Sequence, residues 1–150
     1  MMNVDTMRFI DRYCGVPLTG IVTWLVKLLS VFTPPGKTPP RAILFIELSE
    51  MGSAVLADPA MRKARDAFGA RIFFLIFSNN RDSLLLLRTV REGDIFVIRE
   101  DSLGHLFLDT LKFLADVRKR KIDAVIDLEL FSRFTALLTG LSGARRRAGF

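Results

Sequence analysis

Hydrophobic and polar residues follow two different patterns along the chain, and the pattern changes near residue 40. Residues 15–32 are almost wholly apolar, and the proline-rich stretch 33–40 follows them. Beyond residue 40, short apolar runs alternate with segments of helical periodicity. Proline is excluded from helix interiors and central strands, so residues 33–40 are predicted to form a linker. We therefore expect a helical segment at 1–32, this linker, and an α/β domain at 41–150.

The domain is predicted to contain five strands separated by helices. The expected strands are 42–48, 71–77, 94–99, 124–128 and 145–150, and the expected helices are 53–68, 82–90, 102–121 and 131–141. Strands that are apolar throughout are typical of parallel sheets with both faces covered. Strand–helix alternation with short links predicts right-handed crossovers, so the expected fold class is α/β, a doubly wound, Rossmann-like parallel sheet.

Apolar spacing also predicts which helix faces are buried. The inward positions expected for helix 53–68 are Val55, Leu56, Pro59, Ala60, Ala64 and Ala67. Those expected for helix 102–121, with Asp101 or Ser102 as its cap, are Leu106, Leu108, Leu111, Phe113 and Leu114. Asp58 is expected to face solvent or to cap backbone groups that Pro59 frees.

The apolar segment 15–32 is interrupted by a narrow polar stripe. The stripe, with its extension toward the N-terminus, consists of Arg8, Arg12, Thr19, Thr23, Lys27 and Ser30. A helix of about sixteen residues spans about 24 Å, less than the ~30 Å hydrocarbon core of a bilayer. These features favour a helix lying in the membrane interface, with Trp24 near the headgroups. A transmembrane anchor and a helix packed on its own protein are the alternatives.

The charge balance is mildly basic, with 22 Lys and Arg against 16 Asp and Glu and a net charge of +6. This excess favours anionic partners such as phosphates or acidic lipid. The basic run 118–121 closes a predicted helix, where cations are favourable in any case, so no nucleic-acid partner is predicted. A single Cys and a single His leave no disulfide framework and no Cys- or His-based metal centre, and the lone Cys favours a reducing compartment.

Ligands of doubly wound sheets bind at the carboxyl ends of the strands, which places the candidate site on the loops there. The first loop, 49–53, opens a helix, where backbone N–H groups favour an anionic guest. Ser49, Gly52 and Ser53 are its candidate binding residues, and on spacing alone a capped helix start without a ligand is the favoured alternative. The loop holds one glycine, so it is neither a dinucleotide fingerprint nor a P-loop.

A second group of candidates follows the fourth predicted strand. Alternation places Asp127 and Glu129 on the same side of this strand, near the ligand edge. They are expected either to bind sugar hydroxyls or to cap the helix that follows. Arg133 lies one turn into that helix, where it is expected to line the site or to pair with Glu129.

Four stretches of the domain resemble glycosyltransferase family 9, the lipopolysaccharide heptosyltransferases. They are ILFIELSEMG at 43–52, LADPAMR at 56–62, IDAVIDLE at 122–129 and LTGLSGARRRAGF at 138–150. They match, in the family's order, its first strand and loop, its Leu-Pro-Ala-Leu helix, its D-x-x-I-D-L strand and its S-G-A-x-x-R-x-G-F segment. The resemblance extends over residues 41–150.

The resemblance implies the N-terminal, acceptor-side half of a GT-B enzyme. Such an enzyme transfers heptose from ADP-heptose to the lipopolysaccharide core or a related glycolipid, with inversion and without a metal or other cofactor. The nucleotide sugar is held by a C-terminal domain that is absent from this chain. The implied location is the cytoplasmic face of a bacterial inner membrane, which segment 15–32 would contact.

One departure from the family pattern concerns the catalytic base. The family has an aspartate after Met-Gly, and this chain has Ser53 there. A serine hydroxyl is not a general base near neutral pH, so Glu50 in the same loop is the expected substitute, with Asp58 as a second choice. The alternative is a non-catalytic, membrane-associated glycan-binding or scaffold module that keeps the fold. A further alternative is a peripheral membrane protein whose function lies in its first helix.

Overall fold

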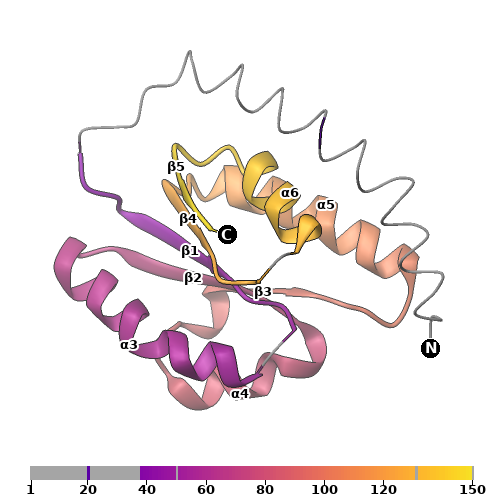
Figure 1. Cartoon of the computed structure of the whole chain (residues 1–150), viewed down its shortest axis with the longest axis horizontal. Coiled ribbons are helices and arrows are strands. Elements are labelled where there is room, and N and C mark those ends of the chain that lie inside the picture. The colour runs from indigo at the N-terminus through magenta and orange to yellow at the C-terminus, as the bar shows by residue number, and fades with distance from the viewer. Residues whose placement is uncertain (1–19, 21–37, 50, 131, 150) are drawn as a thin grey trace.

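The computed structural model describes residues 20, 38–49, 51–130 and 132–149. A five-stranded sheet runs through the centre of this part of the chain, with helices on both faces (Figure 1). The strands are β1 (Ala42–Ile46), β2 (Arg71–Phe77), β3 (Ile95–Ile98), β4 (Ala124–Asp127) and β5 (Arg146–Ala148). The helices are α3 (Met51–Phe68), α4 (Arg81–Leu87), α5 (Leu103–Lys119) and α6 (Arg133–Leu141), with short 3₁₀ turns at Ser78–Asn80 and Glu92–Asp94.

The sheet is parallel throughout, with the strand order β3-β2-β1-β4-β5. The crossover from β3 to β4 returns the chain to the other side of β1, which is the doubly wound arrangement. Helices α3 and α4 lie on one face of the sheet, and α5 and α6 on the other (Figure 1). The predicted fold class is therefore confirmed, and the strand and helix boundaries differ from the predicted ones by a few residues at most.

The two faces of the sheet build two separate hydrophobic cores. Ile43, Phe45 and Phe74 pack under α3 and α4, while Leu44, Phe73 and Leu75 pack under α5 and α6. Successive residues of one strand point to opposite faces, so a strand must be apolar at every position to serve both cores. This requirement explains the continuous apolar runs of β1 and β2.

The predicted inward face of α3 was wrong. Leu56 is 81% exposed and Val55 is 48% exposed, whereas Ala54, Ala57 and Met61 are buried. Pro59, Ala60 and Ala67 are also exposed, and Ala64 is half-buried. Large side chains from β1 and β2 fill the layer beneath this helix, so small residues on α3 let its backbone approach the sheet.

The apolar side of α5 was only partly predicted. Phe113 and Leu114 are buried, as expected, together with Val117. Leu108 is 60% exposed and Leu111 is 49% exposed. The helix has apolar residues over more than half of its circumference, and apolar spacing alone does not distinguish the half that meets the sheet.

None of the helices in the described residues is long and apolar enough to cross a membrane. Segment 15–32, which was predicted to contact the membrane, lies outside the described residues except for Gly20.

Candidate functional site

The loops that follow β1, β2, β3 and β4 meet at the carboxyl edge of the sheet, where the candidate site was predicted. Strands β1 and β4 are direct neighbours there, and Ile46 is in register with Asp127. Strand β2 lies on the other side of β1. The loop after β1 is therefore flanked by the loops after β2 and β4, and both of these bind it.

Glu129 holds the first loop from the β4 side. Its carboxylate accepts hydrogen bonds from the backbone N–H of Leu48 (2.9 Å), from the backbone N–H of Ser49 (3.3 Å) and from the Ser49 hydroxyl. From the β2 side, the Asn80 side-chain amide donates to the carbonyls of Leu48 (3.0 Å) and Ser49 (3.1 Å). Both the donors and the acceptors of residues 48–49 are thus satisfied by neighbouring loops, which fixes the backbone directly before α3.

These bonds also determine the charge state of Glu129. Burial by itself would raise the pKa of Glu129, but hydrogen bonds from Ser49, Leu48 and the Glu47 side chain lower it below its usual range. Glu47 is only 3% exposed. Glu129 therefore favours its charged form.

Asp127 is held from the side of α6. It is 5% exposed, and burial raises its pKa despite hydrogen bonds from Thr135 and from the Glu129 backbone N–H. The Thr139 hydroxyl lies 3.5 Å from its second oxygen. Asp127 therefore joins β4 to α6 beneath the surface. Asp127 and Glu129 stay close together at this end of β4, since the Glu129 backbone N–H donates to the Asp127 carboxylate (3.1 Å).

Neither carboxylate caps α6. The N-cap is Ser132, whose hydroxyl accepts a hydrogen bond from the Thr135 backbone N–H (3.3 Å). Arg133 is exposed in the first turn of α6.

The remaining first-loop candidates lie at the start of α3. Gly52 is exposed, and a Cβ added there would meet no atom within 4 Å. Ser53 is half-buried in the first turn of the helix. Glu50, the predicted substitute base, lies outside the described residues. A side chain could therefore be added at Gly52 without meeting a neighbouring element.

Asp58 faces inward, contrary to the sequence expectation. It is 8% exposed, accepts a hydrogen bond from the Thr89 hydroxyl and forms an ion pair with Arg62 (2.8 Å). Thr89 follows α4, so Asp58 connects two helices on one face of the sheet. This position removes Asp58 from the carboxyl edge and from the role of base.

Sequence reasoning missed Asn80 and Glu47 as residues that position the first loop. Residues 78–80 were interpreted only as a turn or cap. Their signal was a pair of asparagines, Asn79 and Asn80, one residue beyond the end of a strand that is buried on both faces. Asn79 likewise donates to Glu100 in the loop after β3, which extends the network to a third loop. No group of three or more His, Cys, Asp or Glu in the described residues could hold a metal ion.

Comparison with known proteins finds similarity at the level of solved structures. The sequence matches no family model and no curated protein. The described fold resembles the crystal structure of a glycosyl transferase family 9 protein from Veillonella parvula DSM 2008, with a TM-score of 0.62 and 18% sequence identity. The match covers 73% of this chain and 31% of that one, so this chain spans about a third of that protein's length. The two chains therefore share a fold over most of the length of this one.

Proposed function

We propose that this chain is the acceptor-side half of a family 9 glycosyltransferase. The observation that carries the proposal is that the sequence stretches resembling the family interlock in the structure. Glu129, from stretch 122–129, binds Ser49, from stretch 43–52. Gly149, from stretch 138–150, lies so close to Asp127 that an added Cβ would be 2.8 Å from the Asp127 Cβ. The likeness to the Veillonella parvula structure supports the same proposal.

The proposed reaction is inverting sugar transfer from a nucleotide sugar, ADP-heptose in this family, to a lipopolysaccharide-core or related glycolipid acceptor. The acceptor hydroxyl oxygen attacks the anomeric carbon, a base takes the hydroxyl proton, and the nucleoside diphosphate leaves. The donor would be held by a further domain that this chain does not contain, and no metal or cofactor is required. Segment 15–32 is proposed to contact the inner face of the bacterial inner membrane, where the acceptor would be found.

The described residues narrow the choice of base in the first loop. Glu129 is held in its charged form by three N–H or O–H donors, and Glu47 is hydrogen-bonded to it. A carboxylate with a lowered pKa is a weak proton acceptor. Glu50 is then the remaining carboxylate of this loop and is the proposed base. Gly52 and Ser53 are proposed to position the acceptor, while Ser49, Asp127 and Arg133 shape the same edge.

The first prediction is that Glu50→Gln abolishes most sugar transfer. The measurement is transfer from ADP-heptose by the full-length product of the gene, and kcat is expected to fall by about 10²–10⁴ because general-base assistance is lost. The matched control is Asp66→Asn, which neutralises an exposed carboxylate at the other end of α3. Unchanged turnover in Glu50→Gln would remove Glu50 from the mechanism.

A non-catalytic glycan-binding or scaffold module is the second candidate, favoured by Ser53 at the position of the family's aspartate. The same assay distinguishes the two, with the 150-residue chain run beside the full-length product. An enzyme is expected to transfer sugar only as the full-length product, because GT-B chemistry takes place between two domains. Folded protein without transfer in either sample would favour the binding module.

A further inference from the structure

The structure separates the charges of this chain onto two opposite edges of its sheet. In a parallel sheet all strands start at one edge, and each helix returns the chain to that edge. The links that lead into the strands are 38–41, 65–71, 88–94, 118–123 and 142–146, and they carry eleven basic and four acidic residues. The links that leave the strands are 47–51, 78–82, 99–103 and 127–133, and their described residues include three basic and six acidic ones.

The basic excess of the chain is therefore concentrated opposite the candidate site. We refer to the edge formed by the links that lead into the strands as the basic edge. Part of its charge is already used, because buried Asp94 binds Arg71 (2.8 and 2.6 Å) and Arg120 (3.1 Å). Five cations of this edge are exposed and form no ion pair with any described residue, namely Arg41, Arg91, Lys119, Lys121 and Arg145. These five cations are available to a partner.

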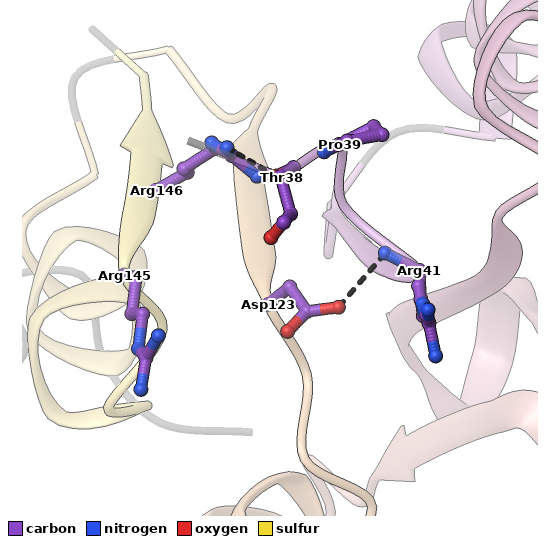
Figure 2. A pocket seen from close by; sticks show the side chains of 6 residues that line it. All are labelled: Thr38, Pro39, Arg41, Asp123, Arg145 and Arg146. Carbon is purple, nitrogen blue, oxygen red and sulfur yellow. Dashed lines mark hydrogen bonds between the residues drawn. The ribbon is translucent and has the colours of Figure 1, made fainter. Parts of the chain in front are cut away.

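Two of these cations lie in a small pocket of about 80 Å³ where the linker enters the domain. Figure 2 shows the side chains of Arg41 and Arg145 on either side of Asp123, with Thr38 and Pro39 above them. Asp123 uses one carboxylate oxygen to bind the backbone N–H groups of Arg41 (2.8 Å) and Ala42 (3.1 Å). Arg146 donates to the Thr38 carbonyl. The pocket thus holds the first described residues of the linker between three arginines.

We propose that the basic edge is a docking surface for an anionic lipid membrane. The chain that leaves this edge at Thr38 leads, through the linker, to the apolar segment 15–32. A membrane attracts the two parts by different forces, because its interior takes up apolar side chains and its anionic headgroups attract nearby Lys and Arg. The charge of nucleic acid would suit the basic edge but would give no environment for an apolar segment. A lipid surface has both anionic headgroups for the edge and an apolar interior for segment 15–32.

This orientation places the candidate site on the side of the domain that faces away from the membrane. Strand β1 has five residues and a strand rises about 3.3 Å per residue, so the two edges lie about 17 Å apart. Taken with the glycosyltransferase proposal, this separation requires an acceptor whose reacting sugar stands about that far above the headgroups. The docking proposal itself does not depend on sugar transfer, because vesicle binding is measured without any sugar nucleotide.

The test compares binding of the full chain to phosphatidylcholine vesicles with and without phosphatidylglycerol. Arg41→Gln/Arg145→Gln is compared with Lys63→Gln/Lys112→Gln, which removes the same charge from exposed helix positions away from the basic edge. One cation near an anionic surface contributes about fivefold in affinity, so the edge variant is expected to bind phosphatidylglycerol vesicles about 25-fold more weakly. The control variant is expected to stay close to the original chain.

Binding to neutral vesicles separates the role of the edge from that of the apolar segment. Trp24 is the single tryptophan of the chain and lies in segment 15–32, so a blue shift of its fluorescence reports insertion of that segment. The shift with neutral vesicles is expected to be equal in both variants and the original chain. If the edge variant melts at a lower temperature, Lys119→Gln/Lys121→Gln replaces it.

Two outcomes would overturn the proposal. If the edge and control variants bind phosphatidylglycerol vesicles equally weakly, then binding depends on net charge alone and not on the basic edge. Tighter binding of a duplex oligonucleotide than of phosphatidylglycerol vesicles, at about 0.15 M salt where surface charges are screened beyond about 8 Å, would assign the edge to nucleic acid instead.

Discussion

Gly149 is a residue whose identity depends on a contact with a distant part of the chain. Its backbone lies against Asp127, and an added Cβ would be 2.8 Å from the Asp127 Cβ and 3.4 Å from its carbonyl oxygen. Neither of these atoms can move without shifting the end of β4. The glycine of stretch 138–150 is therefore explained by packing between β4 and the end of β5.

Gly149→Ala is expected to lower the free energy of unfolding by about 1–3 kcal/mol, because overpacking forces the backbone apart. The measurement is urea unfolding followed by circular dichroism. Gly104→Ala is the control, since a Cβ there meets nothing within 4 Å and alanine favours the helix. A Gly149→Ala variant as stable as the original chain would show that β5 can move away from Asp127.

Asp109 is a second residue with a specific, measurable state. Arg99 binds its carboxylate through two guanidinium nitrogens (2.8 and 2.9 Å) and through its backbone N–H (3.0 Å). These hydrogen bonds lower the pKa of Asp109 from 3.8 to about 2. Because the folded state holds the proton less tightly, the pair stabilises the fold above the unfolded pKa, and this stabilisation is lost as the pH falls to about 2.

Titration of the Asp109 carboxyl by NMR is expected to show a midpoint near 2. As the pH falls from about 4 to about 2, the pair loses its contribution to the free energy of unfolding. This loss is expected to be absent in Asp109→Asn. Asp66→Asn is a suitable reference because Asp66 is largely exposed and, among the described residues, forms an ion pair with its neighbour Arg65. A midpoint of Asp109 near its ordinary value would mean that the Arg99 contact does not persist in solution.

At the scale of single elements, helix α3 shows how far periodicity predicts structure. Its position and its end at Phe68 followed from the sequence, but its orientation did not. Apolar residues lie on more than one side of this helix, and one of the large ones, Leu56, points outward. The rotation of α3 was decided by the volume that β1 and β2 leave beneath it, which no pattern within the helix records.

Met61→Ala and Leu56→Ala should therefore have very different effects. Met61 is fully buried, so its truncation is expected to cost about 2–5 kcal/mol, whereas truncation of Leu56 should change stability by less than about 0.5 kcal/mol. Both variants remove a large apolar side chain from the same helix, and each is the control for the other. A large loss in Leu56→Ala measured on the 150-residue chain would restore the face predicted from the sequence.

At the scale of the whole molecule, the sheet keeps like charges together. The basic edge and the acidic carboxyl edge each hold an excess of one sign, and repulsion within each edge opposes folding. The buried pairing of Asp94 with Arg71 and Arg120 reduces this repulsion at the basic edge. Added salt screens the charges of the remaining exposed cations.

Raising NaCl from about 0.1 to about 1 M is therefore expected to raise Tm, because the Debye length falls from about 10 to about 3 Å. The rise should be smaller in Arg41→Gln/Arg145→Gln than in Lys63→Gln/Lys112→Gln, since only the first variant relieves repulsion at the basic edge. Calorimetry of the three proteins checks this. A Tm that falls with salt would indicate that favourable ion pairs, and not repulsion, dominate the surface.

The sequence alone determined the fold class, the order of strands and helices, and the edge of the sheet on which the candidate loops lie. These features depend on local properties, namely apolar periodicity and the position of turns, which neighbouring residues encode. The tertiary structure decided the rotation of α3, the burial of Asp58 and Asp127, and the fixing of residues 48–49 by Glu129 and Asn80. It also decided that the basic residues, scattered along the chain, lie together opposite the site. Each of these depends on residues that are far apart in sequence, and only the packing of the strands brings them into contact.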